Sequence, residues 1–387
     1  MKSLIRAESK RVLNRNIFIL IIVIIILFSV ISGLMGLNSY KVISGNKILY
    51  TAKENLRRSK KESKYTFLDK EFISSLKDKK IDNIQFYKNI DKILVKNYDL
   101  ISYSELTESR AKDFYNKRLI NIKKNLEGDG EKDYSKKDIK YLLQKANKIK
   151  KPIQMDYAEG WKNINRDLGM LVLLLIIISS IVILQIFGKI DKFNMDELSR
   201  TTRKGKMELS IAKVIVAIKI SLIIYFTGIL ILLIVNGIIY GFEGFSMSIQ
   251  SNPTYLYSIF KINYLQQFLI NVSLGLVALL FMVGFVLFVT AVTKNLLIGG
   301  VITVFFWALM FVFEMLKDYE INHYFANFLP IKMTDFTMHY NANDIYKIFD
   351  NRYNSIIWTI MVTILISLIL FILSYLIYVF RQNKERT

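Results

Sequence analysis

Six long runs of apolar residues divide the chain, and they constrain its fold more than its length or charge does. A helix needs roughly 20 mostly apolar residues to cross about 30 Å of hydrocarbon. The first run extends from Ile17 to Met35 without a charged residue, and five later runs resemble it. Backbone groups in lipid must hydrogen-bond within their own segment, so each run is predicted to be a spanning helix.

The expected fold class is an all-α integral membrane protein with six transmembrane helices and a large, mostly helical extracellular domain between helices 1 and 2. The predicted spans are 17–36, 169–188, 214–240, 267–293, 296–316 and 356–380. Only Lys294 and Asn295 separate the fourth span from the fifth, which predicts a tight helical hairpin. The other connections are 189–213, 241–266 and 317–355.

The long segment 37–168 carries the pattern of a polar helical domain. Stretches rich in Lys and Glu, such as Tyr50 to Lys64 and Lys136 to Lys150, favour helices. Gly128-Asp129-Gly130 predicts a break between helices.

The first apolar run also resembles a cleaved signal peptide, because basic residues precede it. It is longer than the usual signal core of roughly 7 to 15 residues, and no small-x-small cleavage site follows it. We therefore favour an uncleaved helix over a cleaved signal.

Basic residues beside the spans predict the orientation of the chain. Segments 1–16, 189–213 and 381–387 are rich in Lys and Arg, and short basic flanks are retained in the cytoplasm. Both termini are therefore expected inside, in a multi-pass protein of a bacterial plasma membrane. The segment 37–168 is expected outside, because loops longer than about 60 residues are translocated largely regardless of charge. The loops 241–266 and 317–355 are expected outside because successive spans alternate in direction.

The formal net charge of +21 is assigned to this orientation and to anionic membrane lipid, rather than to nucleic acid. The chain has no Cys, which excludes disulfides, thiolate metal sites and a cysteine nucleophile.

Few residues in the spans carry reactive chemistry. Lys219 and Glu314 lie near span ends, where we expect their charges to reach water rather than a substrate. Three amides in or beside the spans are expected to hydrogen-bond between helices: Gln185, Asn236 and Asn271.

Catalytic, metal and cofactor sites are not predicted. His323 and His339 lack the spacing of a zinc motif. The sequence also lacks the G-x-x-x-x-G-K-[ST] phosphate loop, so any ATP must be bound by another chain. We expect a protein that is not itself an enzyme.

Three sequence features flank the first two spans. Residues Ser3 to Leu13 form an amphipathic pattern before the first span, and Gly160-Trp161 precedes the second. After the second span comes Thr201-Thr202-Arg203-Lys204-Gly205-Lys206, followed by Ala212-Lys213. In this order and topology the chain resembles the permease subunits of ABC transporters of the type-2 exporter superfamily.

The resemblance implies that 189–213 is a coupling segment that docks on a cytoplasmic ATP-binding cassette subunit. The residues implied in docking are Thr201, Thr202, Arg203, Lys204, Gly205, Lys206 and Lys213. It further implies a second permease copy, in a homodimer or a heterodimer, with a pathway between protomers lined by spans one, two and five.

The expected function is thus the permease subunit of an ATP-driven exporter for a peptide, an antibiotic or another amphipathic substrate. The alternative is a non-transporting membrane sensor or immunity protein with a ligand-binding extracellular domain. A membrane enzyme would need a catalytic cluster that the sequence lacks.

Overall fold

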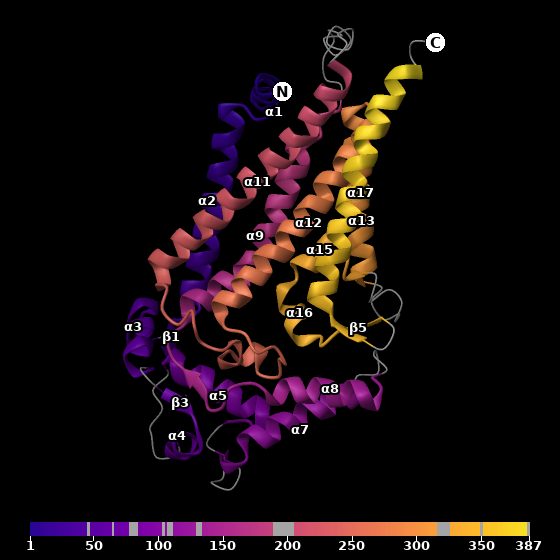
Figure 1. Cartoon of the computed structure of the whole chain (residues 1–387). Helices are drawn as coiled ribbons and strands as arrows, with labels where there is room; N and C mark the ends of the chain where they lie inside the picture. Colours follow the sequence, from indigo (N-terminus) through magenta and orange to yellow (C-terminus); the bar gives the residue numbers. More distant parts are fainter. Residues whose placement is uncertain are drawn as a thin grey trace.

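Six apolar helices form the bundle that dominates the structure (Figure 1). The computed structural model describes residues 1–44, 47–63, 66–76, 84–102, 105–106, 111–128, 134–188, 205–315, 326–348 and 351–384. Within these ranges, six helices are long and apolar enough to cross a membrane: α2 (Arg15–Asn38), α9 (Glu159–Ile183), α11 (Gly205–Tyr240), α12 (Tyr264–Thr293), α13 (Leu296–Met315) and α17 (Ser355–Lys384). The predicted set of six apolar helices is confirmed.

Two of these helices begin nine or more residues before their predicted spans. The spans were predicted to start at 169 and 214, but α9 begins at Glu159 and α11 at Gly205. Hydropathy locates only the apolar part of a helix. The first turns of α9 continue the helix because Trp161, Ile164 and Leu168 are buried there.

Helices α9 and α12 form the centre of the bundle. In the described residues, 56% and 61% of their most apolar stretches are buried, against 22% for α2, 17% for α13 and 22% for α17. Small residues allow close helix approach. Gly275 of α12, for example, lies against Val172 of α9 and Tyr225 of α11.

The predicted hairpin between α12 and α13 is confirmed. Lys294 adopts a left-handed conformation with φ of 54°, which ends α12. The side-chain oxygen of Asn295 then accepts a hydrogen bond from the Leu297 amide at 2.9 Å. Phe285 and Phe306 stack across the hairpin with ring centroids 4.1 Å apart.

The segment between α2 and α9 folds as a separate unit at one end of the bundle, and we call it the inserted domain (Figure 1). Its longer helices are α3 (Ala52–Glu62), α4 (Lys70–Ser75), α5 (Gln85–Tyr98), α7 (Phe114–Glu127) and α8 (Lys136–Asn147). Helices α3 and α8 fall in the two stretches predicted to be helical. Its core includes Ile90, Ile93 and Phe114.

Short antiparallel strand pairs, which the sequence did not predict, complete the described structure. They are β1 (Val42–Ser44) with β2 (Lys47–Tyr50), β3 (Thr66–Leu68) with β4 (Ile153–Met155), and β5 (Ile345–Ile348) with β6 (Asn351–Asn354). Strands of three or four residues are too short to show a clear alternation of polar and apolar residues. Pairing of Leu68 with Ile153 brings an early segment of the inserted domain next to its last segment.

Shorter helices line the same end of the bundle. They are η2 (Ile249–Ser251) and η3 (Pro253–Tyr255) between α11 and α12, and α15 (Pro330–Thr334) and α16 (Phe336–Asn341) between α13 and α17. The end of α17 and the N-terminal helix α1 (Lys2–Val12) lie at the opposite end (Figure 1). There, Arg11 of α1 donates to the Ile186 carbonyl at 3.3 Å.

Replacement of Gly160 tests the packing where the inserted domain meets the bundle. A Cβ atom at Gly160 would overlap the Gly241 carbonyl oxygen, whereas one at Gly300 would meet nothing nearer than Leu184 at 3.8 Å. We expect Gly160→Ala to lower the melting temperature of the detergent-solubilised protein by several degrees. Gly300→Ala should leave it unchanged or raise it slightly, since Ala is favoured over Gly within helices by about 0.5–1 kcal/mol. Equal melting temperatures for the two variants would contradict the close approach.

Candidate functional site

A buried carboxylate marks the point where the inserted domain meets the bundle. Glu159, the first residue of α9, is only 5% exposed. Its carboxylate accepts hydrogen bonds from the Tyr40 hydroxyl at 2.6 Å, the Lys162 ammonium at 2.8 Å and the Asn89 amide at 3.0 Å. Tyr40 follows α2 and Asn89 lies on α5. These four residues, the Glu159 cluster, therefore join α2, α5 and α9.

Tyr40 extends this cluster in two directions. Its hydroxyl accepts from the Asn163 amide at 3.0 Å, and its carbonyl accepts from the Asn55 amide at 2.7 Å. Asn55 of α3 also accepts from the Gln85 backbone amide at 2.9 Å, at the start of α5. Burial and the charge of Glu159 raise the pKa of Tyr40 well above its ordinary value. The hydroxyl thus stays protonated and serves as a donor to the carboxylate.

Aromatic residues beside the cluster connect α11 to the same point. The Tyr157 hydroxyl donates to the Tyr240 carbonyl at 2.9 Å, and the Tyr240 hydroxyl donates to the Gly33 carbonyl of α2 at 2.7 Å. Trp161 donates to the Phe242 carbonyl at 2.8 Å. The Gly-Trp pair noted in the sequence is therefore part of the contact between the start of α9 and the end of α11.

A buried arginine forms the second connection. Arg118 of α7 is 1% exposed and donates to the carbonyls of Leu256 at 2.7 Å and Ser258 at 2.8 Å, in the loop between α11 and α12. Burial lowers the pKa of Arg118 to about 10, so the guanidinium remains charged at neutral pH. Its charge-assisted hydrogen bonds hold α7 on this loop.

An ion pair forms the third connection. Asp138 of α8 has a fully buried side chain, and its carboxylate lies 2.6 Å from the Arg352 guanidinium of β6. Strand β6 leads directly into α17. Lys60 of α3 also pairs with Glu243, just after α11. The inserted domain thus contacts residues at the ends of α2, α9, α11, α12 and α17 or in the segments that adjoin them. We call this whole contact region the junction.

A series of hydrogen bonds between polar side chains continues from the junction into the bundle. The Asn271 amide of α12 donates to the Asn165 oxygen of α9 at 3.1 Å, and the Tyr340 hydroxyl of α16 donates to the Asn271 oxygen at 2.7 Å. The predicted role of Asn271 between helices is confirmed. Asn236 instead donates to the Leu232 carbonyl of its own helix at 3.1 Å.

The residues predicted to dock an ATPase are only partly within the described structure. Thr201, Thr202, Arg203 and Lys204 lie outside the described residues, and Gly205 and Lys206 are described only as the backbone that begins α11. Lys213 is 1% exposed. Its ammonium lies 3.4 Å from the Tyr378 hydroxyl and 5.8 Å from the centre of the Phe187 ring, so it contacts α17 and the segment after α9. The docking role of the segment stays a prediction.

His339 does not form a metal site with other side chains in the part of the chain that the structure describes. His339 is buried in α16, and burial lowers its pKa; His323 and the Glu314 side chain lie outside the described residues. Within the described ranges, no group of three or more His, Cys, Asp or Glu side chains is placed to hold a metal ion.

Apart from Gly160-Trp161, the residues that form the junction were not predicted from the sequence. Glu159 directly precedes Gly160-Trp161, and an acidic residue one helical turn before Asn163 in a mainly apolar helix was the available signal. Its partners were not predictable, because Tyr40 lies 119 residues away and Asn89 lies 70 residues away. Arg118 resembled any other basic residue of a Lys-rich helix.

Comparison of the chain with known protein families, with characterised proteins and with solved structures finds no match.

Substitution of Glu159 tests whether the cluster holds the inserted domain. In Glu159→Gln, one acceptor oxygen becomes an NH2 group that faces a donor, so breaking this buried network should cost about 3–5 kcal/mol. We expect faster amide hydrogen exchange in α5 and at residues 40–44. Glu54→Gln, which removes a half-exposed partner of Arg58, should change exchange little, since surface ion pairs contribute about 0–1 kcal/mol. Unchanged exchange in Glu159→Gln would show that the cluster does not hold α5.

Substitution of Arg118 tests the second connection. Arg118→Met retains an apolar chain but leaves the Leu256 and Ser258 carbonyls without their donor, at a cost of about 1–3 kcal/mol for each unsatisfied group. We expect trypsin to cleave the inserted domain several-fold faster in this variant. Lys124→Met removes an exposed charge from the same helix and serves as the control. Equal cleavage rates in the two variants would argue against the connection.

Proposed function

We propose that the chain is the permease subunit of an ATP-driven ABC exporter, with ATP hydrolysed by a separate cytoplasmic subunit. The observation that carries this proposal is the two-ended arrangement of the molecule. Helix α1, the start of α11 and the end of α17 lie at one end of the bundle, and the inserted domain lies at the other (Figure 1). A permease needs such an arrangement, because its energy source and its cargo act on opposite sides of the membrane.

Charge supports the assignment of the first end to the cytoplasm. Lys10 and Arg11 occupy the last turn of α1, and the sequence that precedes α11 contains Arg203 and Lys204. Basic residues close to span ends are retained inside. The inserted domain is then extracellular, and both termini are cytoplasmic. A short basic segment on the inner side suits an acidic groove on an ATP-binding partner.

The proposed dimer uses apolar faces that a single chain leaves exposed. Leu20, Leu27 and Leu34 of α2 are each more than half exposed, as are Leu297 and Val301 of α13. A second permease copy covers part of these faces in the proposed dimer, whether a homodimer or a heterodimer. The pathway then lies between protomers and is lined by α2, α9 and α13, the first, second and fifth spans. An apolar lining suits a peptide, an antibiotic or another amphipathic substrate.

The junction has a role in this proposal as a mechanical connection. A tilt of α2, α9 or α11 should move the inserted domain as well. Buried hydrogen bonds of Glu159, Tyr40 and Tyr240 connect these helices to the domain and resist stretching. ATP-driven motion at the inner end thereby changes the position of the extracellular domain at the outer end.

Purification of the tagged protein from its native membrane in mild detergent tests the proposal. We expect a stoichiometric ATP-binding subunit to remain bound. The triple variant Arg203→Glu, Lys204→Glu and Lys206→Glu should reduce its recovery at least fivefold without loss of membrane insertion, since the charge that matches an acidic partner is reversed.

The matched control reverses three charges on the inserted domain instead, with Lys53→Glu, Arg57→Glu and Lys61→Glu, all exposed on α3. It should retain the ATP-binding subunit. Repeated recovery of the unaltered protein without such a subunit would refute the permease proposal and favour a membrane sensor or immunity protein.

A further inference from the structure

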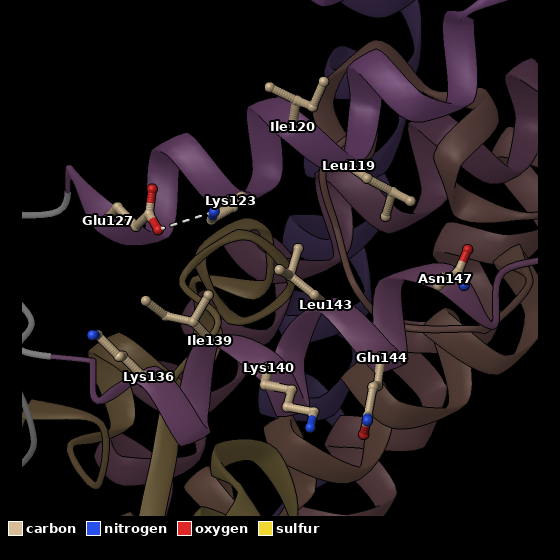
Figure 2. Close-up of a pocket in the computed structure, with 10 residues that line it drawn as sticks. All are labelled: Leu119, Ile120, Lys123, Glu127, Lys136, Ile139, Lys140, Leu143, Gln144 and Asn147. Carbon is tan, nitrogen blue, oxygen red and sulfur yellow. Dashed lines mark ion pairs between the residues drawn. The ribbon is translucent and has the colours of Figure 1, made fainter.

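The inserted domain carries a groove that the proposed function does not use. It lies between α7 and α8 and has a volume of about 690 Å3 (Figure 2). Leu119 of α7 and Ile139 and Leu143 of α8 lie between the two helices and form its apolar floor (Figure 2). The volume falls in the range of roughly 300–1,000 Å3 that is typical of ligand sites.

The floor of the groove is partly buried, and Leu119, Ile139 and Leu143 also pack against the small core that joins α7 and α8 to the bundle. Ile122 of α7 and Leu142 of α8 pack with Ile259 and Ile345 from the loops of the bundle. Ile120, which lines the groove, is 55% exposed. At about 100° per residue, Ile120 and Ile122 point to nearly opposite sides of α7. Ile120 therefore forms the outer edge of the groove, on the side of α7 away from Ile122, while the floor lies nearer the core that contacts the bundle.

Positive charge surrounds the apolar floor. The lining includes Lys123, Lys136 and Lys140 against one acidic residue, Glu127. Glu127 and Lys123 lie 3.5 Å apart and are both about half exposed, so this pair is weak. Lys136 and Lys140 are exposed and lie one turn apart along the edge of α8. The charge of the rim thus favours an acidic ligand.

The shape of the groove favours a helical ligand. The lining extends from Leu119 to Glu127 on α7 and from Lys136 to Asn147 on α8, which correspond to about 12 Å and about 17 Å at 1.5 Å per residue. An amphipathic helix binds such a groove through apolar residues at positions i, i+3 or i+4, and i+7. A ligand helix of about three turns matches the length of the lining along α8.

We propose that the α7–α8 groove binds an acidic amphipathic peptide in helical form. Its apolar side chains contact Leu119, Ile139 and Leu143, and its carboxylates face Lys136 and Lys140. A soluble or secreted peptide fits better than membrane lipid, because the groove belongs to the inserted domain and its outer edge at Ile120 is exposed. The proposal rests on the groove alone and does not depend on ATP-driven transport.

A direct binding measurement tests the proposal. The probe is a fluorescein-labelled helical peptide of about 14 residues, with Leu at i, i+3, i+4 and i+7 and Glu at most other positions. The full chain is held in nanodiscs of neutral phosphatidylcholine, and binding is followed by fluorescence anisotropy. We expect saturable binding that weakens with salt, and at least tenfold weaker binding of a peptide in which Lys replaces every Glu.

Two groove variants separate the charge from the apolar floor. Lys136→Gln with Lys140→Gln alters only exposed side chains and should weaken binding about five- to tenfold at low salt and less at high salt. Leu143→Gln should weaken it more than about tenfold at both salt concentrations. Lys53→Gln with Lys61→Gln removes the same charge from α3 and should bind as the unaltered protein does.

Equal binding of the acidic and basic peptides would overturn the proposal, as would groove variants that bind like the α3 control. A third outcome would also overturn it. If the peptide does not bind, but anionic phosphatidylglycerol vesicles bind the chain and the groove variants abolish that binding, the groove is a lipid contact.

Discussion

The buried carboxylate of Glu159 is the interaction on which the position of the inserted domain depends. A charge that is 5% exposed has lost most of its water, which costs several kcal/mol unless other groups replace it. Tyr40, Asn89 and Lys162 supply that replacement from three directions. Because the carboxylate stands where the domain ends and α9 begins, its partners fix how the domain is oriented on the bundle.

The bundle was predictable because membrane insertion is a local property of the sequence. Each apolar run identifies its own helix, and the hairpin at Lys294 and Asn295 follows from the short separation of two runs. The junction was not predictable, because it consists of contacts between segments distant in sequence. Lys213 illustrates the difference: the resemblance implies that it docks a partner, and nothing in the sequence indicates its contact with Tyr378, 165 positions later.

The junction combines connections of very different strength. Lys60 and Glu243 are both about half exposed, so water competes with their pairing and their contribution is small. Asp138 has no exposed side-chain area, and Arg118 is 1% exposed. For these two residues, loss of the partner would leave a buried polar group without compensation. The domain is therefore held by a few buried connections, whereas its exposed charges are available to ligands.

The same reasoning indicates which parts of the bundle can move. Helices in lipid gain little hydrophobic energy from association, so exposed apolar faces of α2 and α13 can exchange lipid for another helix at low cost. Helix α2 is nevertheless held near the inserted domain, where the Gly33 carbonyl accepts from Tyr240. Tyr40 then follows α2 and bonds to both Glu159 and Asn163 of α9. A displacement of α2 relative to α9 must therefore stretch the Tyr40 contacts or carry the inserted domain with it.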